Sequence, residues 1–160
     1  AGDSFVDNYG NFDVNFDGSE IFKRAVRGMA KEIRHVLGDL QISSEDIDLI
    51  IPHQANSIII ESLAKHMKVT MSQVVLNIQN YGNTSAATIP VAMVEALEDG
   101  RIKPGSRLLL AAFGAGLTRG AGMIRWGDRV TPLGESEAEL PPCDQTALEI
   151  LSDAIKHTQV

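Results

Sequence analysis

The spacing of apolar residues predicts three helices in the first hundred residues. In residues 19–37, apolar positions recur at three- and four-residue steps, which is the period of an amphipathic helix, and Gly38 is the residue expected to stop it. A second helix is expected over residues 57–67. A third, over residues 84–100, is built of small and apolar residues, and Pro90 within it predicts a kink or a locally opened turn.

Short runs of branched apolar residues predict four strands. Residues 46–52 form the first, which Pro52 ends, and residues 73–78 form the second. The other two are residues 106–114 and 121–126, joined by a short glycine-rich turn. Strands separated by helices pair in parallel, whereas the last two are expected to pair antiparallel. The pattern predicts an α/β fold with a mixed, mostly parallel sheet and helices packed on it.

The two ends of the chain differ in character from its middle. We expect residues 1–18 to be a leading loop and residues 19–127 to be the folded domain. Residues 128–160 are expected to form a polar, acidic linker followed by a short amphipathic helix over residues 144–157. The first residue is Ala1 rather than methionine, which suggests a fragment or a processed piece.

Composition narrows the class of protein. A chain of 160 residues that is 44% hydrophobic fits one globular domain with a sizeable core. A formal charge of −7 argues against general nucleic-acid binding, which needs clustered cations on a basic domain. No apolar run reaches the roughly 18 residues of a membrane span, and no secretory leader is apparent, so we expect a cytoplasmic protein that binds no membrane.

Cysteine and histidine usage adds two expectations. The single cysteine, Cys143, can form no disulfide within the chain, which fits a reducing compartment. Four histidines lack the spacing to cysteines or carboxylates that metal sites use, so we expect no metal site; they are His35, His53, His66 and His157.

Polar and aromatic residues stand where three predicted strands end. His53 follows the first strand, Asn83 lies past the second, and Phe113 precedes the Gly-Ala-Gly turn after the third. Singly, each has an ordinary structural explanation: a half-buried histidine bonded to a carbonyl, a helix N-cap, and a residue beside a tight turn. Because the carboxyl ends of parallel strands meet at one sheet edge, their joint occurrence favours a ligand site there.

Three segments in this order and spacing resemble a known family. "IPHQAN", "NYGNTSAATIPVAMVEAL" and "DGRIKPGSRLLLAAFGAGLTRGAGMIRW" are similar to the C-terminal half of a beta-ketoacyl-acyl-carrier-protein synthase III, a thiolase-fold condensing enzyme. The resemblance runs from about Gly18 to Trp126. It implies a thiolase-like half-fold, to which a separate N-terminal half of the enzyme contributes the rest.

The resemblance implies roles for individual residues. His53 and Asn83 match the histidine and asparagine of a Cys-His-Asn site, where both donate hydrogen bonds to the thioester carbonyl of malonyl-carrier protein. The catalytic cysteine belongs to the N-terminal half, and Cys143 lies at no matched position. Phe113 matches an aromatic residue beside this pair, and Ala115 matches a position whose backbone N–H belongs to an oxyanion hole.

Further residues match substrate and partner contacts. Asn56 either contacts the pantetheine arm or caps the following helix, and both readings are open. Lys23 and Lys65 match basic positions that meet the acidic carrier protein. Lys23 also begins a basic row at helical spacing, which is either a docking surface or a solvated helix face; its members are Lys23, Arg27, Lys31 and Arg34.

The implied function is a decarboxylative Claisen condensation of an acyl thioester with malonyl-acyl carrier protein. The expected substrates are an acyl-coenzyme A thioester and malonyl-carrier protein, with no cofactor, and the expected partners are the N-terminal half, the carrier protein and a second copy in a homodimer. This chain alone is expected to be inactive and to expose apolar surface, since the helix from Thr84 to Leu97 carries few charges. The alternatives are a non-catalytic subunit of a heteromeric enzyme and an acyltransferase that does not decarboxylate.

Overall fold

The structure, a computed structural model, describes residues 18–131 together with 134, 144–146, 148–150 and 152. It also gives the backbone of two short antiparallel strands, β1 (Phe5–Val6) and β2 (Phe12–Asp13), inside the segment for which we expected a loop. The main elements follow as α1 (Gly18–Leu40), β3 (Leu49–Pro52), α2 (Ser57–Met67), α3 (Ile78–Tyr81), α4 (Thr88–Glu98), β4 (Arg107–Gly114) and β5 (Thr118–Arg125).

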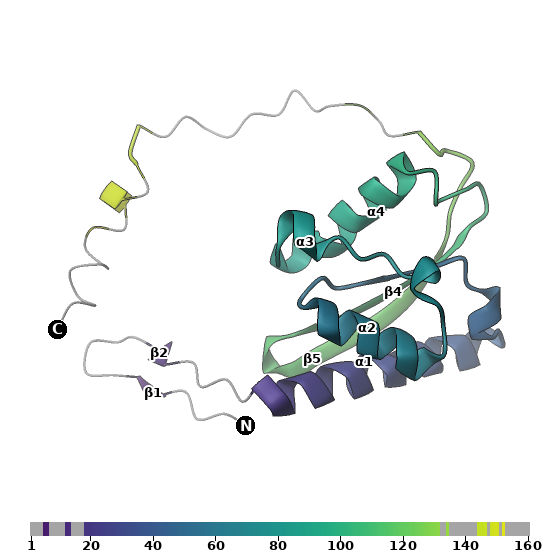
Figure 1. Cartoon of the computed structure of the whole chain (residues 1–160), viewed down its shortest axis with the longest axis horizontal. Coiled ribbons are helices and arrows are strands. Elements are labelled where there is room, and N and C mark those ends of the chain that lie inside the picture. Colours follow the sequence, from purple (N-terminus) through teal and green to yellow (C-terminus); the bar gives the residue numbers. More distant parts are fainter. Residues whose placement is uncertain are drawn as a thin grey trace.

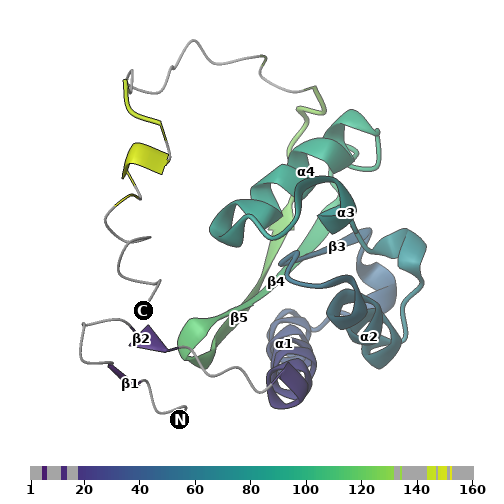
Figure 2. The same ribbon diagram turned by 60° about the vertical axis from the view of Figure 1, so that its left-hand side comes forward.

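A three-stranded sheet in the order β3-β4-β5 forms the middle layer. β3 pairs with β4 in parallel, with Ile50 opposite Leu109, and β5 pairs with β4 antiparallel, with Met123 opposite Leu109. The helices α1 and α2 cover one face of the sheet and α4 covers the other (Figures 1 and 2). The predicted mixed sheet with packed helices is therefore confirmed.

Each face of the sheet has its own apolar core. On one face, Met29 and Ile33 of α1 pack with Ile60 and Leu63 of α2 against Leu109, and all five side chains are at most 1% exposed. The second core joins α4 to the opposite face through Leu49, Ile51, Ala92, Ala96 and Leu108. Alternate residues of β3 therefore serve opposite layers, which explains why this strand reads as an unbroken apolar run.

α1 continues two residues past Gly38, where it was predicted to stop. Gly38 lies inside the helix, which continues to Leu40, and Gln41 takes the left-handed conformation with φ 54°. The Ile42 N–H donates to the Leu37 carbonyl at 3.0 Å, and the Gln41 N–H donates to the Gly38 carbonyl at 3.1 Å. These are the two hydrogen bonds of a Schellman motif. Gln41 therefore occupies the left-handed position after the helix in which Gly38 was expected.

α4 begins later than the predicted helix over residues 84–100. Residues 85–87 form a 3₁₀ turn, and α4 starts at Thr88. Pro90 is the third residue of α4, in the first turn, where a backbone N–H has no partner within the helix. The proline ring therefore breaks no helical hydrogen bond. Val94 is 49% exposed, so α4 is not buried on all sides by the described part of this chain.

The predicted strand over residues 73–78 is wrong. Only an isolated parallel bridge between Val74 and Ile50 forms there, and the Val75 N–H donates to the Ile50 carbonyl at 2.9 Å. β3 ends immediately afterwards at Pro52, which has no N–H to extend a ladder. Beyond Pro52, the side chain of Gln54 makes the hydrogen bonds that a strand would have made to this segment. It donates to the Val75 carbonyl at 3.1 Å and accepts from the Asn77 N–H at 3.0 Å.

The C-terminal tail is described in part. Residues 148–150 and 152 are helical, and Thr146 and Glu149 exchange hydrogen bonds as a capping box, with Thr146 N–H donating to Glu149 Oε2 at 2.7 Å. A helix is therefore present within the predicted range 144–157, but residues 144–146 are not helical, so it starts later than predicted; residues 147, 151 and 153–157 lie outside the described part. In the described part of the chain, no helix combines the length and the apolar character needed to cross a membrane.

Replacing the Gln54 amide should destabilise the fold. Gln54→Leu leaves the buried carbonyl of Val75 and the N–H of Asn77 without their partner, so we expect the free energy of unfolding to fall by about 1–3 kcal/mol. The matched control, Gln79→Leu, alters an exposed side chain and should change it by less than about 0.5 kcal/mol. Denaturant unfolding measures both, and equal effects would contradict the role of Gln54.

The end of α1 offers a second test of stability. Gln41→Gly should stabilise the protein by up to about 1 kcal/mol, because glycine adopts the left-handed conformation without the penalty of a side chain. Gly38→Ala should also stabilise it by about 0.5–1 kcal/mol, because Gly38 is helical and a Cβ there meets nothing within 4 Å. Thermal unfolding distinguishes this from Gly38 as the helix stop, for which Gly38→Ala would destabilise.

Candidate active site

His53 stands at the carboxyl end of β3, where the sheet positions its ring. Its backbone N–H donates to the Ala111 carbonyl of β4 at 2.8 Å, which continues the parallel pairing one residue past Pro52. This places the His53 ring edge-on to Phe113, with ring centroids 5.7 Å apart and planes at 72°. Burial lowers the pKa of His53 below its ordinary value of 6.5, so the imidazole is neutral at pH 7.

Thr88, the first residue of α4, contacts the same ring. Its Oγ1 lies 2.6 Å from His53 Nδ1 and 3.0 Å from the Ser85 carbonyl oxygen. Thr88 is only 2% exposed. Sequence reasoning missed this residue, because it is 35 positions from His53 and looks like an ordinary helix residue; its polarity in an apolar run was the one available signal.

Asn83 lies in the strained turn between α3 and α4. Gly82 and Ser85 both have positive φ, 66° and 53°, and the Asn83 side-chain carbonyl accepts from the Ser85 N–H at 2.9 Å. The helix N-cap reading of Asn83 is therefore wrong, since Thr84 is the N-cap of the 3₁₀ turn and Ala87 that of α4; the Asn83 side chain instead holds the turn before them. With Oδ1 engaged by the backbone, Nδ2 is the end of the amide that can donate to a ligand.

The structure brings four predicted site residues to one cavity of about 950 Å³: His53, Asn83, Phe113 and Ala115. Thr88 lines it as well. Ala115 begins the 3₁₀ turn Ala115–Leu117 between β4 and β5, and Gly116 follows with φ 118°, a conformation that favours glycine. Residues from the ends of β3 and β4 and from the start of α4 therefore converge on a single space.

Two carboxamides and a carboxylate support the segment that leads to Asn83. Asn77 Nδ2 donates to Glu95 at 2.6 Å, and Asn80 Nδ2 donates to the other oxygen of the same carboxylate at 3.2 Å. Gln54 holds the Asn77 backbone from the opposite side. The path of the chain into the Asn83 turn is thus fixed by α4 and by the residue next to His53.

A second cavity, of about 420 Å³, lies between α1 and the β4–β5 turn. Its cationic lining comes mostly from α1 and consists of Lys23, Arg24, Arg27, Lys31 and Arg119. Arg119 of β5 donates to Glu32 of α1 at 2.9 Å and crosses Gly28, where a Cβ would approach its side chain to 2.9 Å. Phe113 and Arg119 line both cavities, so the basic cavity adjoins the one that holds His53.

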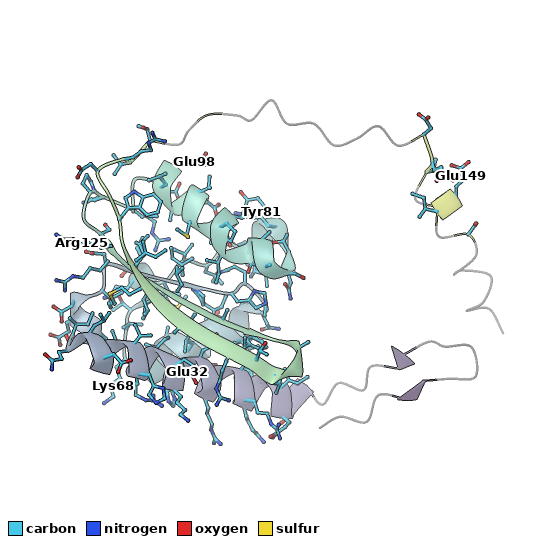
Figure 3. The ribbon with its side chains drawn as sticks, turned by 180° about the vertical axis from the view of Figure 1, so that it is seen from behind. Glu32, Lys68, Tyr81, Glu98, Arg125 and Glu149 are labelled. Atoms are coloured by element: carbon cyan, nitrogen blue, oxygen red, sulfur yellow. The ribbon has the colours of Figure 1, made fainter. Side chains whose placement is uncertain are left out.

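Figure 3 shows Glu32 on α1 beside the β4–β5 ribbon, and Lys68 just past α2. Two further predicted residues line neither of these cavities. Asn56 is the N-cap of α2, where its side-chain carbonyl accepts from the Ile58 N–H at 2.8 Å. Lys65 is exposed in the last turn of α2.

No group of three or more His, Cys, Asp or Glu side chains gathers as a metal site in the described part of the chain. Cys143 and His157 lie outside the residues that the structure describes.

Comparisons with known proteins match this geometry to one family. The family model described as "3-Oxoacyl-[acyl-carrier-protein (ACP)] synthase III C terminal" matches residues 37–126. A beta-ketoacyl-[acyl-carrier-protein] synthase III 2 of Vibrio cholerae is 55% identical over 157 residues, which cover 98% of this chain and 43% of that protein. The beta-ketoacyl-[acyl-carrier-protein] synthase III of Campylobacter fetus is 47% identical over 124 residues, 78% of this chain and 38% of that protein. The chain spans less than half the length of these relatives.

Solved structures agree with the family match. The crystal structure of 3-oxoacyl-[acyl-carrier-protein] synthase III from Aquifex aeolicus is similar at a TM-score of 0.70 and 44% identity, over 77% of this chain and 39% of that chain. The corresponding synthase from Pseudomonas aeruginosa gives a TM-score of 0.72 at 35% identity, over 80% of this chain and 39% of that chain. The thiolase-like α/β fold predicted from the sequence is thereby confirmed, and the chain belongs to the 3-oxoacyl-[acyl-carrier-protein] synthase III family, matching its C-terminal domain.

Proposed function

We propose that this chain is the C-terminal half of an enzyme that condenses an acyl thioester with malonyl-acyl carrier protein and releases carbon dioxide. The observation that carries the proposal is that His53 and Asn83 line one cavity, each with a side chain suited to donate a hydrogen bond without adding net charge. A positive imidazolium would bind a carboxylate as well as a developing oxyanion, whereas two neutral donors favour the oxyanion.

The nucleophile in this proposal is a cysteine of the N-terminal half, which takes the acyl group as a thioester. The malonyl thioester then loses carbon dioxide, and the electron pair of the broken C–C bond moves into an enolate. His53 and Asn83 donate to the enolate oxygen; a donor of this kind contributes about 2.7–4 kcal/mol in oxyanion sites. The enolate carbon attacks the acyl carbonyl, a C–C bond forms, and the cysteine leaves as thiolate.

The β4–β5 turn is proposed to serve the acyl-transfer step. The backbone N–H of Ala115 would donate to the oxyanion formed when the cysteine is acylated or released, and Gly116 allows the turn that presents it. Phe113 packs against the His53 ring in an edge-to-face contact. Asn56 is proposed to contact the pantetheine arm through Nδ2, which is compatible with capping α2 through Oδ1.

The acidic acyl carrier protein is the proposed partner of the basic row on α1. All four of its residues are exposed, and none forms an ion pair with a residue that the structure describes; they are Lys23, Arg27, Lys31 and Arg34. Lys23 and Arg27 also line the cavity that adjoins the site. Lys65 on α2 is proposed as a further contact. The complete enzyme is proposed to act as a homodimer without a cofactor, on an acyl-coenzyme A primer.

Alanine at either donor should separate the two half-reactions. His53→Ala or Asn83→Ala, in the complete enzyme, should lower malonyl decarboxylation and condensation by a factor on the order of 10²–10³, because each removes one donor to the enolate oxygen. Acylation of the cysteine should stay within a few-fold of the parent, as followed by mass spectrometry of the acyl-enzyme.

Three outcomes would contradict this assignment. Equal loss of acylation and decarboxylation in a folded variant would show that the residues do not act on the enolate. A parent enzyme that is acylated but never decarboxylates malonyl-carrier protein would favour the simple acyltransferase, and one that is never acylated would favour the non-catalytic subunit.

Reversing charge on α1 tests carrier-protein docking. Lys23→Glu with Arg27→Glu should raise the Michaelis constant for malonyl-carrier protein about ten-fold or more at low salt, and less at high salt, because exposed charges are screened. The control, Lys103→Glu with Arg125→Glu, makes the same change in net charge at exposed positions at the end of the sheet opposite the β4–β5 turn. If both pairs of substitutions change the Michaelis constant equally at every salt concentration, the basic row on α1 is a solvated helix face and not a docking surface.

A further inference from the structure

The short helix α3 leads the chain toward Asn83 without an apolar anchor in the described part of the molecule. None of its four residues, Ile78–Tyr81, is buried, and none belongs to either apolar core. A helix of this length has too few internal hydrogen bonds to be stable by itself. Polar contacts therefore determine where α3 lies relative to the rest of the fold.

Glu95 joins α4 to α3 through both oxygens of its carboxylate. Oε2 accepts from Asn77 Nδ2 at 2.6 Å, and Oε1 accepts from Asn80 Nδ2 at 3.2 Å. Asn77 occupies the N-cap position of α3, where an asparagine ordinarily bonds the first turn of its own helix, yet its side chain makes no capping bond there. The amide of Asn77 thus bonds Glu95 in place of its own helix.

Both sides of this contact are held in place. Asn77 is 3% exposed, and its backbone N–H donates to Gln54 Oε1 at 3.0 Å. On α4, Ala92 and Ala96 are at most 1% exposed in the core that fixes this helix on the sheet. Glu95 therefore projects from a packed helix toward a buried donor, and leaving that donor unpaired is costly.

The turn that contains Asn83 runs between the two helices that Glu95 joins. It includes positive φ at Gly82 and at Ser85, and the Ser85 N–H donates to Asn83 Oδ1 at 2.9 Å. A strained turn of this kind persists only where the surrounding structure holds it. If α3 were free to move away from α4, the turn could relax and the Asn83 amide would lose its fixed direction.

We propose that Glu95 is a positioning residue for decarboxylation: its carboxylate holds α3 against α4 and so keeps the Asn83 amide aimed at the enolate oxygen. The part of this inference that concerns the reaction rests on the proposed function. Glu95 does not line the cavity that holds His53 and Asn83, so it acts on the substrate only through other residues.

Kinetics of the complete enzyme give the first test. Glu95→Ala should lower kcat for decarboxylation of malonyl-carrier protein by a factor on the order of 10–10², with little change in KM, because a misplaced donor affects the reacting state. Acylation of the cysteine should stay within a few-fold of the parent. Glu95→Gln keeps an acceptor oxygen for Asn77 and should restore decarboxylation to within a few-fold. Asn80→Ala removes only the exposed half of the contact and should give a smaller loss of the same kind, which serves if Glu95→Ala does not fold.

Glu98→Ala is the matched control. It removes the same charge from the same helix at an exposed position, labelled in Figure 3, and should leave both half-reactions at the parent rate. An equal loss of decarboxylation in Glu95→Ala and Glu98→Ala would show that the charge on α4, and not the contact with α3, is responsible.

A double substitution shows whether Glu95 acts through Asn83. In an Asn83→Ala background, Glu95→Ala should change decarboxylation by no more than a few-fold, because the donor that it positions is already absent. The same 10–10²-fold order of loss in both backgrounds would overturn the proposal and make Glu95 a general support of the fold.

Hydrogen exchange supplies a readout that does not depend on activity. Peptides covering residues 78–88 should exchange faster in Glu95→Ala than in the parent or in Glu98→Ala, while peptides of α1 and β4 stay unchanged. Local acceleration in an enzyme whose parent never decarboxylates refutes the proposed function and keeps the positioning of the turn. Unchanged exchange over residues 78–88, or acceleration throughout the chain, overturns that positioning. Local acceleration with an unchanged rate of decarboxylation overturns the role in the reaction.

Discussion

The arrangement of the site depends on how the chain is hydrogen-bonded just beyond β3. Pro52 ends the strand because it has no N–H for a ladder, and the buried amide of Gln54 then spans from the Pro52 carbonyl to the Val75 carbonyl and the Asn77 N–H. The Gln54 side chain, which is 1% exposed, thereby makes the hydrogen bonds that a longer β3 would have made through its backbone. Because Gln54 follows His53 directly, the same bonds that satisfy this backbone also set the distance between the histidine and the segment that leads to Asn83.

The second determinant is the turn that leads into α4. Ser85 adopts a left-handed conformation that is costly for a residue with a side chain, on the order of 1–2 kcal/mol, and the turn is held by backbone and side-chain bonds from Asn83 and Thr88. Strain of this kind persists where surrounding contacts over-determine it, and it often marks functional sites. In this protein the strained turn places the side chains of Asn83 and Thr88 in the lining of one cavity.

Charge is distributed to complement this neutral site. The chain is acidic overall, yet the cavity next to the site is lined by cations of α1 and by Arg119. Glu32 accepts from Arg119, and this ion pair, with its neighbouring charges, lowers the pKa of the Glu32 carboxyl against the opposing effect of desolvation. The basic cavity beside an uncharged polar site supports the proposed docking of an acidic carrier protein.

The local elements could be predicted from short stretches of sequence. The bounds of α2, the parallel pairing of β3 with β4 and the antiparallel β4–β5 pair follow from apolar period and turn residues, which are properties of neighbouring positions. His53, Asn83 and Phe113 could be predicted as site residues because each lies at or just past the end of a predicted strand, whereas Ala115 was expected only from the family resemblance.

Features that depend on partners distant in sequence form only in the folded chain. Residues 73–78 have the composition of a strand, but Gln54 and Arg101 take the carbonyls that a neighbouring strand would have bonded. The end of α1 passed Gly38 because the bonds of Ile42 and Gln41 to the last turn outweighed the left-handed penalty of a glutamine. The contact between Thr88 and His53 joins residues 35 positions apart, and no local period encodes it, since it exists only once α4 is packed on the sheet.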